Sequence, residues 1–127
     1  MSKVYLHRAG FSDKLLGRVE EKGEVYRSDP GIDDRIGHVD LDTGKVYRRK
    51  LGPDEYVGRV ELDSGKVYRH VPADFDDYLG KVEDNGEMYY HKALLPDDYM
   101  GKIRDLISYA HAGAAFLLLV YPAHEAR

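Results

Sequence analysis

The sequence predicts a mainly β protein in which five β-hairpin repeats of about 21 residues close into a ring with pseudo-fivefold symmetry, followed by one apolar α-helix. Three regular spacings lead to this prediction. Tyrosines recur every 21 residues, glycines recur every 20 to 22 residues, and further glycines lie between these two sets. The sets are Tyr5, Tyr26, Tyr47, Tyr68 and Tyr89; the comb glycines Gly17, Gly37, Gly58, Gly80 and Gly101; and Gly23, Gly44, Gly65 and Gly86.

Each repeat is predicted to form a β-hairpin. Residues 16–20 and 24–27 are rich in the Val and Tyr side chains that suit a pleated surface. Lys22-Gly23 between them fits a two-residue turn, because glycine tolerates a positive φ. Such a turn would pair Val19 with Tyr26 and place both side chains on one face of the hairpin.

The ends of the chain indicate how the repeats are arranged. Tyr5 has no Gly-Val strand before it, and residues 101–103 have no Val-Tyr strand after them. Pairing residues 3–7 with residues 100–104 would complete a fifth hairpin and remove the unpaired edges of a linear array. We therefore expect a closed ring, with an open row of five units as the alternative.

One stretch carries a resemblance to a known family. Residues 56–68, Tyr-Val-Gly-Arg-Val-Glu-Leu-Asp-Ser-Gly-Lys-Val-Tyr, resemble the repeat of the small bacterial β-flower proteins. The likeness covers residues 3–104 and implies two-stranded petals around a rotational axis, with no catalytic residue to carry over. A weaker likeness is to MORN-type repeats, which form open arrays.

The composition indicates a single-domain globular protein. The 127 residues are 43% hydrophobic and 33% charged, which predicts one domain at residues 1–104 with a helix at residues 105–122. The net charge of -4 argues against nucleic-acid binding, and the lack of cysteine excludes disulfides and thiol chemistry. No apolar segment follows Met1, so we expect a cytoplasmic protein.

No catalytic motif is present: the sequence has no Gly-rich phosphate loop, nucleophile elbow or His-Glu-x-x-His pair. We therefore expect no enzymatic activity and no cofactor. The first hypothesis is a structural or interaction module that associates with itself. The alternative is a small-ligand or anion-binding protein that uses basic strand residues or the Tyr and His side chains of the ring.

Basic residues define the candidate anion site. The predicted pairing sets Arg18 across from Arg27, Arg59 from Arg69 and His38 from Arg48. Acids lie two residues along the same face, so a solvated lattice of ion pairs is the other interpretation. The candidate residues are Arg18, Arg27, Arg48, Arg59 and Arg69.

Histidines and aspartates suggest further sites. His7, His70 and His91 stand two residues after repeat tyrosines in neighbouring units, where they would hold Zn or Ni or else form separate hydrogen bonds. One Asp stands four residues before each comb glycine, and we expect these aspartates to cap turns rather than to bind calcium. They are Asp13, Asp33, Asp54, Asp76 and Asp97.

The tail is apolar on every side. Its Ala and Leu content predicts a helix that begins near Asp105 and ends before Pro122. The 16 residues 106–121 would span only about 24 Å, so a membrane anchor is the weakest interpretation. We expect the ring to cover one face and a second copy, in a twofold dimer, to cover the other. The expected interface residues are Ala112, Gly113, Ala115, Phe116 and Leu119.

Overall fold

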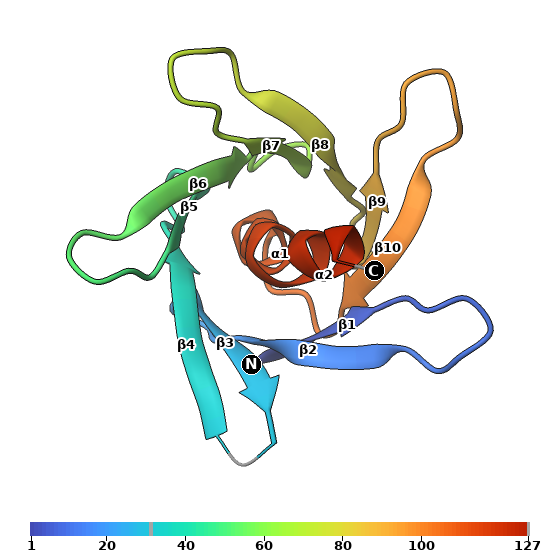
Figure 1. The fold of residues 1–127 in the computed structure, drawn as a ribbon, viewed down its shortest axis with the longest axis horizontal. Helices are drawn as coiled ribbons and strands as arrows, with labels where there is room; N and C mark the ends of the chain where they lie inside the picture. Colours follow the sequence, from blue (N-terminus) through green and yellow to red (C-terminus); the bar gives the residue numbers. More distant parts are fainter. Residues whose placement is uncertain (31, 127) are drawn as a thin grey trace.

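The computed structural model, which describes residues 1–30 and 32–126, is a closed barrel of ten antiparallel strands that encloses a C-terminal helix (Figure 1). Each strand pairs with the strands before and after it in the sequence. The strands are β1 Ser2–Leu6, β2 Lys14–Val19, β3 Glu24–Asp29, β4 Ile32–Val39, β5 Lys45–Arg48, β6 Glu55–Val60, β7 Lys66–Arg69, β8 Asp77–Val82, β9 Glu87–Tyr90 and β10 Asp98–Ile103. The helix comprises α1 Tyr109–Ala115, a π-helical turn η1 Phe116–Val120 and α2 Tyr121–Glu125.

The two terminal strands close the barrel, as predicted. Val4 of β1 lies opposite Ile103 of β10, and Tyr5 lies opposite Lys102. The open row of repeats is therefore excluded. Pairing also runs across the outward loops, for example between β3 and β4, so the wall is continuous rather than a set of separate two-stranded petals.

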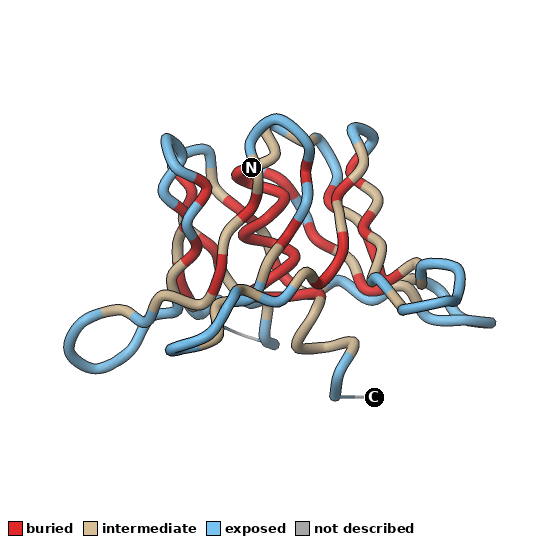
Figure 2. Tube along the Cα trace, turned by 90° about the horizontal axis from the view of Figure 1, so that it is seen from above, coloured by how far each residue is buried: buried red, intermediate tan, exposed pale blue. Residues whose placement is uncertain are grey.

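The two ends of the barrel differ. The loops that join β1 to β2, β5 to β6, β7 to β8 and β9 to β10 project outward, as do the paired ends of β3 and β4; we call them petal loops. They all splay from the same end of the barrel, and the C-terminal end of the helix emerges there (Figure 2). We call this end the petal end and the other, which carries the tight hairpin turns, the turn end.

The predicted register within the hairpins is wrong by one residue. The backbone N–H of Glu20 donates to the carbonyl of Glu24 at 2.8 Å, so the loop holds three residues, not two. Val19 therefore faces Val25, and Tyr26 faces Arg18. Because side chains alternate along a strand, this shift points Val25 inward and Tyr26 outward.

A β-bulge precedes each comb glycine. Opposite β5, for example, Val46 pairs with Gly58 while the next residue, Tyr47, pairs with Tyr56, which leaves Val57 as the extra residue. Because of the bulge, two consecutive residues, an apolar one and the comb glycine, both face the interior of the barrel. A Cβ atom at Gly58 would overlap the carbonyl oxygen of Tyr68 on β7, so only glycine fits.

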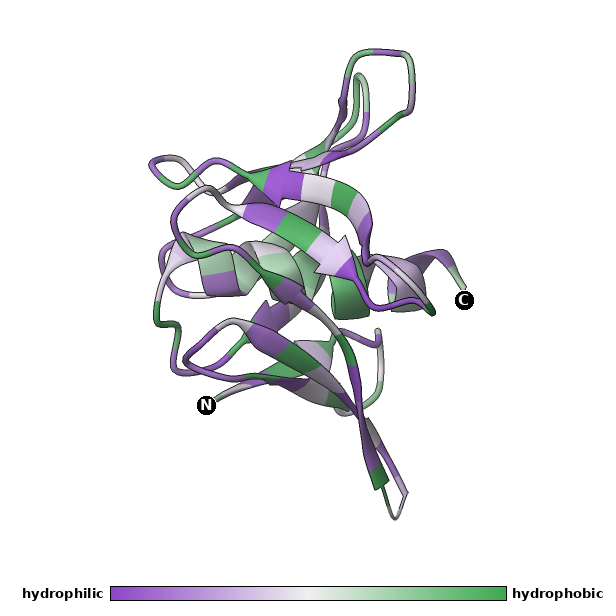
Figure 3. Ribbon diagram, turned by 90° about the vertical axis from the view of Figure 1, so that its left-hand side faces the viewer, coloured by the Kyte–Doolittle hydropathy of each residue, from purple (hydrophilic) through white to green (hydrophobic). Residues whose placement is uncertain are grey.

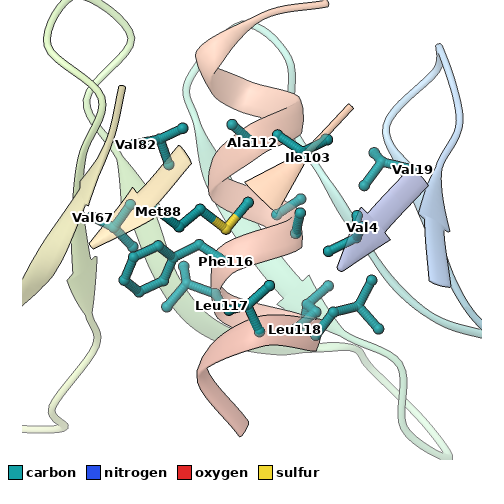
Figure 4. Packing of buried hydrophobic residues seen from close by; sticks show 14 of the residues in the cluster. Val4, Val19, Val67, Val82, Met88, Ile103, Ala112, Phe116, Leu117 and Leu118 are labelled. Carbon is teal, nitrogen blue, oxygen red and sulfur yellow. The ribbon is translucent and has the colours of Figure 1, made fainter. Parts of the chain in front are cut away.

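The helix fills the barrel and is buried on every side. Residues 110–120 are all buried within the single chain, and Figure 4 shows helix side chains pointing at the inner faces of the surrounding strands. In Figure 3 the helix is largely hydrophobic in colour, whereas the loops are largely hydrophilic. Barrel diameter grows with strand number, and ten strands with Val and Gly on the inside leave room for a narrow helix.

The expected dimer interface on the helix is therefore wrong. Its five residues lie inside the barrel, none more than 5% exposed where a value is given, and have no free face for a second copy. They are Ala112, Gly113, Ala115, Phe116 and Leu119. The close approach predicted for Gly113 does occur, but its neighbour is Val60 of β6.

Polar contacts fix the helix at the turn end. The buried His111 ring lies 2.8 Å from the carbonyl oxygen of Glu21 and 2.7 Å from the hydroxyl of Ser108, the N-cap residue. The Ser2 hydroxyl donates to the carbonyl of Asp105 at 2.7 Å. These contacts explain why the helix begins at Tyr109 and not near Asp105 as predicted.

The helix also continues past its predicted end. The π-helical turn η1 shifts the backbone hydrogen bonds by one residue, so that the N–H of Tyr121 bonds to the carbonyl of Phe116. Pro122, which has no N–H to donate, then falls in the first turn of α2, where it is tolerated. No helix in the described part of the chain is both long and apolar enough to cross a membrane.

Candidate functional site

Two adjoining cavities lie at the petal end, between the barrel wall and the last turns of the helix. A cavity of about 700 Å³ lies against Arg27 and Arg48; we call it the basic cleft. A second cavity of about 350 Å³ lies beside Tyr56 and Tyr121; we call it the aromatic cavity. Arg48 and Pro122 line both, so the two cavities adjoin.

The basic cleft carries a strong excess of positive charge. Five basic side chains and one carboxylate, that of Asp34, line it. Arg35 is ion-paired with Glu24 at 2.9 Å and Lys50 with Glu55 at 3.2 Å. The remaining basic residues, Arg27, Arg48 and Arg49, form no ion pair with any residue in 1–30 or 32–126.

The corrected register places three of the predicted arginines at this end. Arg27, Arg48 and Arg69 each follow a repeat tyrosine and pair with a comb glycine on the preceding strand. The tyrosine points outward, so the arginine next to it turns toward the helix, where it contributes to cavity walls. The equivalent positions on β1 and β9 hold Leu6 and Tyr90, so the basic residues lie on one side of the petal end.

Arg69 differs from the other two arginines at the mouth. Its guanidinium is ion-paired with Asp77 and lies 3.5 Å from the Tyr121 hydroxyl. The hydrogen bond to Asp77 raises the pKa of Arg69 above its usual range. Its charge is therefore already balanced within the chain.

Arg18 and Arg59 lie on the outer wall and not in the cleft. The Arg18 guanidinium stacks over the Tyr26 ring at 4.3 Å and pairs with Glu20 and Asp33. Arg59 does the same over Tyr68 at 4.2 Å, with Asp76 at 3.1 Å. The lattice interpretation is confirmed for these two residues, and the predicted pairing with Arg27 and Arg69 is wrong.

The candidate metal-binding histidines do not converge. His7, His70 and His91 each face an aspartate of their own petal loop, at 3.4 to 3.5 Å. The petal loops diverge (Figure 1). Each imidazole packs against a different tyrosine, His7 on Tyr99, His70 on Tyr56 and His91 on Tyr78. Within residues 1–30 and 32–126 no group of three His, Cys, Asp or Glu side chains is placed to hold a metal ion.

Aromatic side chains link neighbouring strands on the outer wall. The Tyr78 ring lies 5.5 Å from Tyr68 and 5.1 Å from His91, and the Tyr56 ring lies 5.7 Å from Tyr47 and 4.8 Å from His70. Burial raises the pKa of both Tyr56 and Tyr78 above the usual value. These rings stiffen the wall on which the petal loops stand.

The aspartates before the comb glycines take part in the same lattice. Asp13 lies 3.6 Å from Lys102, Asp54 lies 3.4 Å from His38 and Asp76 lies 3.1 Å from Arg59. Each therefore joins its petal loop to the neighbouring hairpin. These side chains accept hydrogen bonds or ion pairs from basic groups instead of the turn N–H groups that we expected them to cap.

Three residues of the basic cleft were missed by the sequence prediction: Arg35, Arg49 and Lys50. The available signal was the run Arg48-Arg49-Lys50, which places three basic residues in succession at the end of β5. In a strand that ends at the mouth, such a run concentrates positive charge at a single petal loop.

Comparisons with known proteins do not assign the site. No family model, no curated protein and no solved structure matches the chain. Function must therefore be inferred from the geometry of the petal end.

Proposed function

We propose that the protein is a non-enzymatic binding protein for a small anion, which it holds in the basic cleft at the petal end. One observation carries the proposal. Arg27 and Arg48 extend from adjacent hairpins toward the same 700 Å³ cleft, and no carboxylate of the described residues pairs with either.

Physical chemistry supports a phosphate-like ligand. Like charges that face one another destabilise a protein unless a counter-charge neutralises them. Arg35 and Lys50 are balanced by Glu24 and Glu55, so the Asp34 carboxylate balances only part of the charge of the remaining three arginines. Guanidinium groups bind phosphate through paired hydrogen bonds, and the volume of the cleft is typical of ligand pockets.

Phosphate is therefore expected to stabilise the folded protein. A ligand that binds only the folded state adds about 2.7 kcal/mol when its concentration is 100 times its Kd. We expect sodium phosphate to raise the melting temperature by several degrees over sodium chloride at equal ionic strength. The double variant Arg27→Gln, Arg48→Gln should lose this increase and keep its circular dichroism spectrum.

A matched control removes two positive charges elsewhere. Lys45→Gln, Lys66→Gln changes exposed residues at the turn end of β5 and β7 and should keep the full response to phosphate. An equal loss of response in both double variants would mean that net charge alone acts. No response in the unaltered protein would overturn the proposal.

The petal tips favour a second function, self-association. Several large apolar side chains at these tips are almost fully exposed, including Leu51 and Leu94 at 104% and Phe75 at 92%. Leu94 also has a φ of +63°, a backbone conformation that favours glycine. Both features destabilise an isolated chain, so we propose that the tips contact a second copy.

Light scattering tests this second proposal. The full-length protein is expected to gain apparent mass with rising concentration, and the triple variant Leu51→Ser, Phe75→Ser, Leu94→Gly should stay a monomer. Ser and Gly remove the apolar tips without touching the core. A full-length protein that remains monomeric at every concentration would refute self-association through the petal loops.

We further propose that the ten strands are five copies of one hairpin about a pseudo-fivefold axis, in the manner of the β-flower proteins. The 21-residue spacing of the repeat tyrosines and the bulge before each comb glycine support this proposal. The symmetry is broken at the mouth, where three of five equivalent positions hold arginine. Binding sites commonly require such departures from a repeat.

A further inference from the structure

We propose that the ligand of the basic cleft is an aromatic phosphate, whose planar ring occupies the aromatic cavity while its phosphate group lies on Arg27 and Arg48. This inference rests on the proposed anion binding and names the class of ligand. It follows from the composition of the aromatic cavity, from its charge balance and from its position beside the cleft.

The aromatic cavity is suited to a flat ring. Tyr56 and Val57 of β6 line it from the barrel wall, and Leu117, Tyr121 and Pro122 line it from the helix. Its 350 Å³ falls within the range of small-molecule pockets. Aromatic rings stack favourably on tyrosine faces and on apolar side chains.

The charges of this cavity are already matched. Arg69 is paired with Asp77, His70 with Asp76 at 3.5 Å, and Glu55 with Lys50 at 3.2 Å. Glu125 adds a further carboxylate to the lining. Arg48 also lines the aromatic cavity and offsets Glu125, so this cavity lacks the excess of positive charge found in the basic cleft and suits an uncharged ring better than a phosphate group.

The two cavities lie side by side, so a phosphate group in the basic cleft and a ring in the aromatic cavity are able to belong to one molecule. Arg48 and Pro122 contribute to both walls, so one small molecule is able to enter both. Tyrosine is protonated at neutral pH, and burial raises the pKa of Tyr56 and Tyr121 further, so both phenol rings are neutral. An anion without a ring would not displace water from the aromatic cavity.

Calorimetry on the full chain tests the inference with three probes: inorganic phosphate, phenyl phosphate and adenosine 5′-monophosphate. We expect the two aromatic phosphates to bind at least about tenfold more tightly than inorganic phosphate, because stacking adds to the charge interaction. Arg48→Gln should weaken all three. Tyr121→Leu, which keeps an apolar side chain, should remove only the gain of the aromatic probes.

Two further variants keep the test decisive. Tyr56→Leu removes the other tyrosine ring of the cavity, which packs against the His70 ring in the same lining, and should act like Tyr121→Leu. Tyr109→Leu, at the other end of the helix, should leave all three affinities unchanged. Equal affinities for inorganic and aromatic phosphates would overturn the aromatic ligand while leaving anion binding intact. Failure to bind any phosphate would overturn both proposals.

Discussion

Deleting residues 1–7 is expected to prevent the protein from folding. The deletion removes β1 and with it Val4 and Leu6, both of which belong to the core. It also opens the barrel between β2 and β10, which exposes two rows of unpaired backbone groups and one side of the helix. The loss exceeds what a domain of marginal stability tolerates.

The measurement is urea unfolding followed by circular dichroism, with light scattering to detect aggregation. The deleted chain should show no cooperative transition. Two point variants in β1 provide matched controls: Val4→Asn, which points into the barrel, should cost about 3 kcal/mol, and Lys3→Asn, which points outward, should cost little. A deleted chain that stays monomeric and equally stable would show that β1 does not close the barrel.

Local sequence signals were sufficient to predict the β-strands and the pairing of the two ends of the chain. Val and Tyr mark the strands, and the glycines at 23, 44, 65 and 86 mark the turns. Turn length was harder to predict, because glycine ends both a two-residue and a three-residue loop. The difference of one residue reverses every side chain in a hairpin, so Arg27 was assigned to the wrong face.

For the enclosed helix, the sequence predicted that it is buried but not which surface covers it. Its apolar residues on every side predicted complete burial, and residues 110–120 are all buried. Which surface covers it depends on the strand pairing across the petal loops, as between β3 and β4, and no local pattern encodes that pairing. Separate petals would have left one helix face open, whereas a ten-stranded wall encloses it.

The basic cleft was not predicted, because its lining depends both on the register within the hairpins and on the strand pairing across the petal loops. Arg27 and Arg48 line it because the register differs from the predicted one, whereas Arg35 comes from β4 and Lys50 from the loop between β5 and β6. The departure from the repeat was nevertheless visible in the sequence, since Leu6 and Tyr90 replace arginine at the equivalent positions. The residue directly after each repeat tyrosine differs between repeats, and this variation was the sequence signal for the basic cleft.

Replacing Gly58 by alanine is expected to cost more than 3 kcal/mol, and by valine more still. The Cβ atom of either residue would overlap the carbonyl oxygen of Tyr68 and press on Leu117 of the helix at 3.0 Å. The carbonyl is backbone in the adjacent strand, so relief requires the wall itself to move. The obstacle is therefore the backbone of the neighbouring strand and not the Tyr and Val side chains of the same hairpin.

Gly52 supplies the matched control, because it separates available space from backbone conformation. Its φ is +82°, and a Cβ atom there would meet nothing within 4 Å, whereas Gly58 has the clash without a left-handed φ. Gly52→Ala should therefore cost only about 1 kcal/mol, from backbone strain. Equal losses in urea unfolding for the two alanine variants would show that the wall gives way at Gly58. A much larger loss at Gly58 would establish that close contact between strands and helix, and not turn geometry, requires the comb glycines.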